Sequence, residues 1–271
     1  MQVTVGPHVF DVVVDGPADA PAVLLLHGFP QSAHSWRAVR PFLDGYRVIA
    51  PDQRGYSPGA RPAGTEAYRL PELVADALGL LDALGVAQAH VVGHDWGAAV
   101  AWQLGARHSP RVRTLTTVSV PHPRAFVEAL RTDADQRQRS LYMREFATPG
   151  YDARMLADDA AGLRGLFGGS LPSVDVEHLV ARAQQPGALA AWLQWYAAQR
   201  LEDIADTPAV GVPTLHVWSD GDAALGRAGA VGTAAWVTGP YRFEVLEGVS
   251  HWVPEEAADR LGPLLAAHLA R

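Results

Sequence analysis

Two residue types are missing from this sequence, and each absence excludes a class of chemistry. The 271 residues contain no cysteine, which excludes disulfide bonds, thiolate nucleophiles and metal sites made by cysteine. They contain no lysine either, since all 22 basic residues are arginine. A Schiff-base lysine and the lysine of a phosphate-binding P-loop are therefore excluded as well.

Basic charge and long apolar runs are also scarce. The formal net charge is −7, so the chain lacks the basic surface that nucleic acid would require. The longest apolar run near the start is "AVLLL", far short of a membrane span, and the first residues lack the basic start and apolar core of a signal peptide. We expect a cytoplasmic protein that binds neither nucleic acid nor membrane. Metal-ligand spacing and a dinucleotide fingerprint are also lacking, so we expect no metal and no cofactor.

What is present is typical of an α/β protein. With 48% hydrophobic and 19% charged residues, the chain is long enough for one large domain that carries an insertion. In the first half, short β-rich runs alternate with helical patterns expected near 36–43, 70–84 and 96–107. The same rhythm returns after residue 210 in "PTLHVWSD" and "YRFEVLEG". The alternation predicts a mainly parallel sheet flanked by helices.

The middle of the chain has a different pattern. From 123 to 209 the strand signal is lost, and helical segments are separated by the breaks "TPG", "GG" and "QPG". We therefore predict an α/β core formed by 1–122 and 210–271 and an inserted α-helical cap at 123–209. Because ligands of open α/β sheets bind at the carboxyl ends of the strands, such an insertion is expected to cover that end as a lid.

Asp95 occupies the position where hydrolases that attack carbonyl groups usually carry a serine. It follows the apolar strand "AHVV" directly, opens a helix, and stands in the pattern Gly-x-Asp-x-Gly with Gly93 and Gly97. A nucleophile elbow needs small neighbours, because strand and helix approach closely around a strained residue. The alternative is that Asp95 is only a helix N-cap, a common role for aspartate.

Two later strand ends supply the partners of a triad. "PTLHVW" is followed by "SDGDAAL", and "YRFEVL" is followed by "EGVSHWVPEE". Asp222 and His251 thus complete the order nucleophile, acid, histidine of the α/β-hydrolase triad. Asp220 competes for the acid role, but Asp220-Gly221 is typical of the turn itself, so we prefer Asp222.

The segment "LLLHGFPQSAHSW" follows a strand at the place where this fold takes one oxyanion-hole N–H. We assign the hole to the backbone N–H groups of Phe29 and Trp96. No Gly-x-Ser-x-Gly motif is present, so no serine competes with Asp95. The nearby His27, His94 and His122 are expected to hydrogen-bond loops rather than to act in catalysis.

Five motifs together carry a family resemblance: "HGFPQSAHSWR", "DQRGYSPGARP", "GHDWGAAVAW", "WSDGDAAL" and "GVSHWVPEE". The sequence resembles the epoxide hydrolases of the α/β-hydrolase fold, which are close to the haloalkane dehalogenases. The resemblance implies that a small apolar epoxide is converted to a vicinal diol. A carboxylate is already ionised at neutral pH and suits displacement at sp³ carbon. Asp95 would form an alkyl-enzyme ester, which water activated by His251 and Asp222 would hydrolyse.

The same resemblance implies two lid tyrosines that donate to the epoxide oxygen. "SLYMREFATPG" places the first at Tyr142, with Tyr151 as the fallback, and "AAWLQWYAAQR" places the second at Tyr196. A haloalkane dehalogenase would use Trp96 with a second side-chain N–H donor, but Phe29 offers none. A non-catalytic binding protein on a hydrolase fold is the remaining alternative, and it would not need all three triad residues.

Overall fold

In the computed structural model, which describes residues 1–270, eight strands form one sheet in the order β1-β2-β4-β3-β5-β6-β7-β8. β1 and β2 pair antiparallel with each other, as do β2 and β4, and all other neighbours are parallel. The mainly parallel sheet predicted from the sequence is thereby confirmed. The strands are β1 (Gln2–Val5), β2 (His8–Asp15), β3 (Ala22–Leu26), β4 (Arg47–Pro51), β5 (Ala89–His94), β6 (Val112–Val118), β7 (Thr214–Ser219) and β8 (Tyr241–Leu246).

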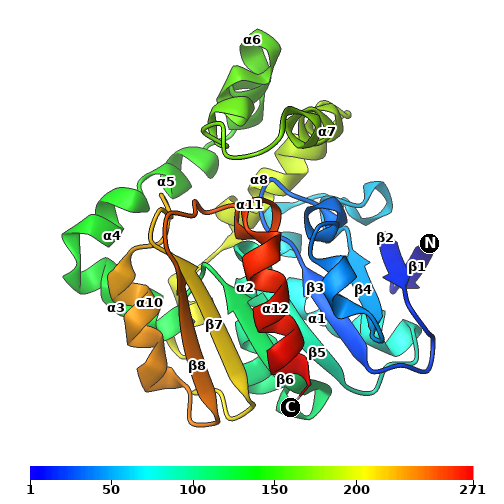
Figure 1. Ribbon diagram of the computed structural model, residues 1–271. Helices are drawn as coiled ribbons and strands as arrows, with labels where there is room; N and C mark the ends of the chain where they lie inside the picture. Colours follow the sequence, from blue (N-terminus) through cyan, green and yellow to red (C-terminus); the bar gives the residue numbers. More distant parts are fainter. Residues whose placement is uncertain (271) are drawn as a thin grey trace.

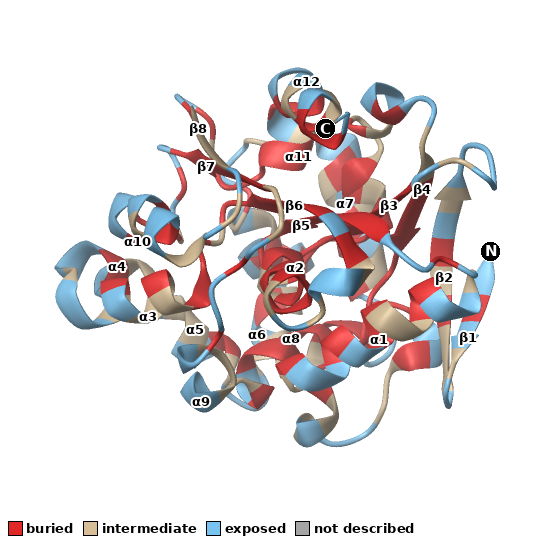
Figure 2. Cartoon of the chain, turned by 90° about the horizontal axis from the view of Figure 1, so that it is seen from below, coloured by how far each residue is buried: buried red, intermediate tan, exposed pale blue. Residues whose placement is uncertain are grey.

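The central strands are buried on both faces (Figure 2). Along β3, Leu24 and Leu26 pack into one core cluster with α1 (Leu70–Ala83) and α2 (Trp96–Arg107). Val23 and Leu25 pack into a second cluster with α12 (Ala258–Leu269) on the opposite face. The two-residue alternation of a strand therefore explains why this apolar run needs helices on both sides.

The long helices α1 and α2 lie where the sequence predicts them, but the helix expected near 36–43 is wrong. That region contains two short 3₁₀ segments, η1 (Ala33–Trp36) and η2 (Arg40–Leu43). Pro41 lies in the first turn of η2 and has no N–H to donate to a preceding carbonyl, so one continuous α-helix cannot cross it. The remaining short 3₁₀ segments are η3 (Pro58–Ala60), η4 (Thr65–Tyr68), η5 (Ser109–Arg111) and η6 (Thr233–Trp236).

Between β6 and β7 the structure contains helices and no strand within the described chain. Figure 1 shows the green and yellow-green helices α5, α6 and α7 above the sheet, on the side where α11 (Val253–Glu256) lies. α10 (Arg227–Gly232) follows β7. The helices of the segment are α3 (Pro123–Thr132), α4 (Ala134–Arg139), α5 (Tyr142–Phe146), α6 (Tyr151–Gly165), α7 (Ser173–Ala183), α8 (Ala188–Ala198) and α9 (Leu201–Ala205).

Within residues 1–270, none of these helices combines the length and the apolar character that a membrane span requires.

Candidate active site

Asp95 lies in the sharp turn that joins β5 to α2. Its backbone has φ 52° and ψ −125°, a positive-φ conformation that residues other than glycine rarely adopt. The flanking glycines permit this turn: a Cβ on Gly97 would lie 2.1 Å from the carbonyl oxygen of Leu26, and one on Gly93 would lie 2.2 Å from the carbonyl oxygen of Gly97. The Gly-x-Asp-x-Gly pattern is thus required by close backbone approach.

Both oxygens of the Asp95 carboxylate have a defined neighbour. Oδ1 accepts a hydrogen bond of 2.8 Å from the backbone N–H of Phe29, and Oδ2 lies 3.5 Å from His251 Nε2. Gly28 makes this possible, since a Cβ there would stand 2.3 Å from Oδ1. The loop after β3 therefore places one N–H donor on the carboxyl group of Asp95, while Trp96 begins α2 at the next position.

The imidazole of His251 is hydrogen-bonded to the acid on the loop after β7. His251 Nδ1 lies 2.8 Å from Asp222 Oδ2, and Asp222 Oδ1 accepts the backbone N–H groups of Ala224 and Leu225 at 2.8 and 2.9 Å. The competing Asp220 is exposed and accepts from the N–H of Gly248 instead. The structure therefore brings Asp95, His251 and Asp222 together and leaves Asp220 outside the group.

Burial and charge set the ionisation of this group. Asp95, Asp222 and His251 are 6%, 1% and 9% exposed. Burial alone lowers the pKa of His251, but the charge and hydrogen bond of Asp222, together with Asp95, raise it to about 10. Burial raises the pKa of Asp95, yet the hydrogen bond and charge of His251 bring it below its ordinary value. At neutral pH the resting site therefore holds an imidazolium between two carboxylates.

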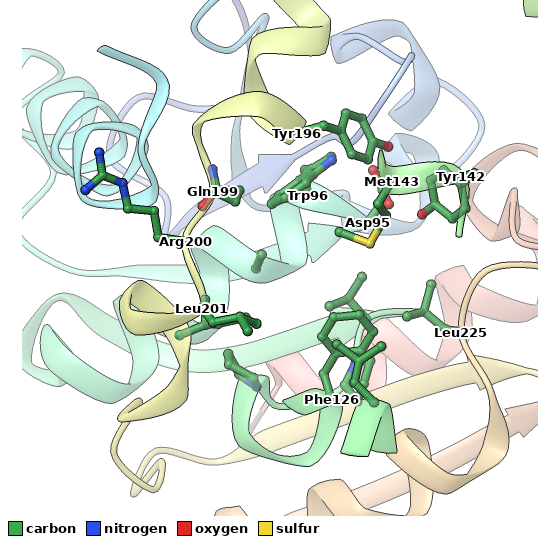
Figure 3. Close-up of a pocket in the computed structure, with 16 residues that line it drawn as sticks. Asp95, Trp96, Phe126, Tyr142, Met143, Tyr196, Gln199, Arg200, Leu201 and Leu225 are labelled. Atoms are coloured by element: carbon green, nitrogen blue, oxygen red, sulfur yellow. The ribbon is translucent and has the colours of Figure 1, made fainter. Parts of the chain in front are cut away.

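Asp95 lines a cavity of about 210 Å³ together with Tyr142 of α5 and Tyr196 of α8 (Figure 3). Their ring centroids are 6.1 Å apart. Burial, with the negative charge of Asp95 contributing, raises the pKa of both phenols, so both hydroxyls stay protonated and can donate. Most other lining residues are apolar: Trp96, Ala99, Val120, Pro121, Pro123, Phe126, Leu130, Met143, Leu201, Ile204 and Leu225.

The fallback tyrosine lies elsewhere. Tyr151 does not line the cavity, and its hydroxyl donates to Glu145 Oε2 at 3.2 Å. The ring of Phe29 packs edge-on against Tyr196, with centroids 5.2 Å apart, and offers no polar hydrogen to a ligand. Trp96 likewise packs against Tyr196 at 5.2 Å. The structure therefore favours Tyr142 over Tyr151 as the neighbour of Asp95.

Sequence reasoning missed a polar chain behind the site. His94, directly before Asp95, lies with Nε2 2.9 Å from the carbonyl oxygen of His251 and with Nδ1 2.9 Å from Gln31 Oε1. Gln31 Nε2 in turn lies 2.7 and 2.9 Å from the two carboxyl oxygens of Glu255. The sequence feature that could have indicated this chain is the carboxylate of Glu255, which stands four residues after His251 in the short helix α11.

Comparison with known proteins identifies the family. Residues 21–258 match the model of the alpha/beta hydrolase fold family. The chain is 34% identical to epoxide hydrolase A of Mycobacterium tuberculosis, over 95% of this chain and 92% of that protein. It is 33% identical to epoxide hydrolase 4 of Mus musculus, over 96% of this chain and 76% of that protein. A protein of the AB hydrolase superfamily from Bacillus subtilis, YfhM, is also 34% identical, over 95% and 93%.

Solved structures agree. An epoxide hydrolase from Bacillus megaterium, solved with an inhibitor, superposes with a TM-score of 0.91 at 25% identity and full coverage of both chains. Epoxide hydrolase A from Mycobacterium thermoresistibile gives 0.89 at 29% identity, over 100% of this chain and 97% of that one. The fold and the triad geometry define an α/β-hydrolase. Within that class, the chain belongs to the epoxide hydrolase family, as the resemblance in its motifs predicts.

Proposed function

We propose that this enzyme opens an epoxide to a vicinal diol through a covalent ester on Asp95. The observation that carries the proposal is the position of the Asp95 carboxylate, which is ionised, held at one oxygen by the Phe29 N–H and exposed to an apolar cavity. Oδ2 attacks a ring carbon, the carbon–oxygen bond of the ring breaks, and the ester forms. A carboxylate needs no prior deprotonation for this displacement.

The ring oxygen leaves as an alkoxide and needs a proton donor. In the proposal Tyr142 and Tyr196 share this task, because both hydroxyls are protonated and both rings line the cavity together with Asp95. The tyrosine that gives up its proton recovers one from His251. Ester formation removes the negative charge of Asp95, which is one of the groups that raise the pKa of His251, so the imidazolium becomes more acidic at that moment.

The second step regenerates the carboxylate. The neutral His251 takes a proton from water, whose oxygen attacks the ester carbonyl of Asp95, while Asp222 stabilises the resulting imidazolium. The negative oxygen of the tetrahedral intermediate lies where Oδ1 accepts from Phe29 in the resting site, and we assign the second donor to the backbone N–H of Trp96. Collapse of the intermediate breaks the bond between the carboxyl carbon and Oδ2. The leaving alkoxide takes the proton of the new Asp95 carboxyl group, which gives the diol, the Asp95 carboxylate and the His251 imidazolium of the resting site.

We further propose that residues 123–209 act as the lid of this site. The cavity is lined by residues of α3, α5, α8 and α9 from this segment, together with Asp95, Trp96 and Leu225 from outside it. Its apolar lining supports a small apolar epoxide as substrate and a water molecule as the second reactant. A cytoplasmic location stays a prediction that cell fractionation can test.

Product analysis tests the proposed function. The purified enzyme is incubated with styrene oxide, with a short aliphatic epoxide and with a bromoalkane, and diol and bromide are both measured. We expect diol from the epoxides, no bromide, and no product from Asp95→Ala. Bromide release without diol would support a haloalkane dehalogenase instead. Binding of the epoxides without either product would support a binding protein.

A further inference from the structure

The polar chain behind His251 connects two ionisable groups that the proposed reaction does not use. It runs from the Glu255 carboxyl group through the Gln31 amide and the His94 ring to the backbone carbonyl of His251, with contacts of 2.7 to 2.9 Å. Gln31 and His94 are 0% exposed, and Glu255 is half-buried. Buried polar atoms at these distances must alternate as donors and acceptors, so the positions of the protons can be counted.

The backbone carbonyl of His251 fixes the first hydrogen position. The carbonyl oxygen of His251 can only accept, so His94 Nε2 must carry a hydrogen to bond with it. With the Gln31 oxygen facing His94, Nδ1 must carry a hydrogen too, and the ring is then a cation. Burial opposes this state, because it lowers the pKa of His94 to about 3. A neutral His94 therefore requires a hydrogen-bond donor opposite Nδ1.

The Gln31 amide supplies that donor when it is turned by half a rotation, which leaves its shape unchanged. Its NH₂ group then donates to His94 Nδ1, and its oxygen faces Glu255. The Glu255 carboxyl group must in that case be protonated, with its O–H donated to Gln31. Either way the chain holds one proton more than an ionised glutamate beside a neutral histidine, and the neutral pair is the one that burial favours.

The surroundings of Glu255 suit the neutral acid. Burial raises its pKa to about 7, against smaller opposing effects of hydrogen bonds from Ser35 and Gln31, and the charge of Asp175 raises it further. Asp175 itself is paired with Arg37 at 2.5 Å and lies 3.2 Å from His34. Arg37 is therefore engaged by another carboxylate, and among residues 1–270 no ion pair is formed with Glu255.

We propose that Glu255 is a positioning residue that, in its protonated form, fixes the backbone carbonyl of His251 through Gln31 and His94. The inference rests on the proposed function, since it concerns the step in which His251 activates water. When Glu255 ionises, the Gln31 NH₂ group turns to the carboxylate and its oxygen faces His94 Nδ1. The neutral ring then changes tautomer, its one proton leaving Nε2 and returning at Nδ1, which donates to the Gln31 oxygen. His94 Nε2 then presents a lone pair to the carbonyl oxygen of His251 at 2.9 Å.

Ionisation of Glu255 removes the hydrogen bond from His94 Nε2 and so weakens the contacts that hold the backbone of His251. The carbonyl of His251 keeps only the N–H of Val253, at 2.9 Å, and a longer contact of 3.5 Å with the Ser119 hydroxyl. Repulsion at His94 shifts the carbonyl and with it the ring that must face the ester. Ester hydrolysis is therefore expected to slow as pH rises through the pKa of Glu255, while the fold remains intact.

The test compares wild type with Glu255→Gln and with the control Glu247→Gln, which makes the same change on an exposed residue of the segment before His251. The amide of Glu255→Gln donates to Gln31 at every pH. Stopped-flow measurement gives the rate constant of ester hydrolysis from about pH 6 to about pH 8.5. Titration of His251 itself affects all three enzymes equally, so the ratio of variant to wild type isolates Glu255.

We expect the ratio for Glu255→Gln to rise by about tenfold over this range, from near one at the acid end, and the ratio for Glu247→Gln to stay constant. A constant ratio for Glu255→Gln, or a variant that is already tenfold slower at the acid end, would overturn the positioning role. Infrared difference spectroscopy supplies a readout that needs no turnover. A buried carboxylic acid C=O band should be present at about pH 6, fade at higher pH, and be absent from Glu255→Gln.

The two readouts separate this inference from the reaction itself. If no ester forms on Asp95, the proposed function fails, and the infrared band still decides whether Glu255 holds the proton. Absence of the band from wild type at the acid end of the range would overturn the inference whatever the enzyme's activity.

Discussion

His251 Nε2 and Asp95 Oδ2 lie 3.5 Å apart in the resting site, with opposite charges. In the proposed catalytic cycle this attraction is temporary. While Asp95 is a carboxylate, His251 is held beside it as a cation and cannot act as a base. Once Asp95 is esterified, the negative charge is lost, and His251 becomes a neutral base next to the ester that must be hydrolysed.

Replacement of His251 by glutamine should separate the two steps. Attack by Asp95 does not require a base, so alkylation continues, while hydrolysis loses its general base, which typically contributes about 10²–10⁴-fold. Intact-protein mass spectrometry should show the covalent adduct after mixing with an epoxide. An unmodified protein that binds the epoxide would indicate that His251 acts before the ester forms.

The two candidate acids should respond differently to the same substitution. Asp222→Asn removes the negative charge that contacts His251 Nδ1 at 2.8 Å, so ester hydrolysis should slow and adduct should accumulate. Asp220→Asn is the matched control, because Asp220 is exposed and its carboxylate accepts from the backbone N–H of Gly248. Equal losses in the two variants would contradict the assignment of Asp222.

The lid tyrosines should act together on alkylation. Tyr142→Phe and Tyr196→Phe each remove one donor and keep the ring packing, so each single variant should slow alkylation. The double variant should fall much further, within the range of about 10²–10⁴-fold that general-acid assistance provides. Hydrolysis of the preformed ester should change little. Tyr151→Phe is the control, and an unchanged alkylation rate in the double variant would remove both phenols from the mechanism.

Gly28→Ala tests the close approach between the loop after β3 and the nucleophile. A Cβ at this position would lie 2.3 Å from Asp95 Oδ1, so the carboxylate or the loop must move. A displacement of about 1 Å can reduce a rate by about 10²-fold, and we expect a loss of this order in alkylation. Gly165→Ala, where a Cβ meets nothing within 4 Å, should leave the rate unchanged.

The ionised triad should also affect stability as pH changes. The pKa of His251 is raised from 6.5 to about 10, so its ion pairs stabilise the fold fully below about pH 6.5, and this stabilisation is lost as pH rises toward 10. The melting temperature of wild type should therefore fall more than that of His251→Gln between neutral pH and about pH 10, by a few degrees. Parallel curves for the two proteins would contradict the raised pKa.

The fold and the residues at the strand ends can be predicted from the sequence because their patterns are local. Asp95, Asp222 and His251 each follow a short apolar strand, and parallel strands end at one edge of a sheet. Tyr142 and Tyr196 had no such signal and came only from the family resemblance, since helix packing in the lid region is not encoded in a short motif. The prediction of one helix near 36–43 is wrong because Pro41 interrupts the segment.

The chain from Glu255 to His94 shows what sequence patterns cannot supply. Gln31 and Glu255 are 224 positions apart in the sequence yet share hydrogen bonds, and His94 was interpreted as a loop-bonding residue. It does bond a loop, but that loop carries the catalytic histidine. Such a role depends on tertiary geometry and on where protons reside in a buried site, and neither can be read from residue spacing.

A single turnover in water enriched in ¹⁸O tests the covalent mechanism most directly. Enzyme in excess over epoxide converts it once, and mass spectrometry measures the label in the diol and in the peptide that contains Asp95. Because water attacks the ester carbonyl, the first diol should carry an unlabelled oxygen from Asp95, and the label should appear in the carboxyl group of Asp95. A first diol that carries the label, with Asp95 unlabelled, would contradict the ester and indicate direct attack of water on the epoxide.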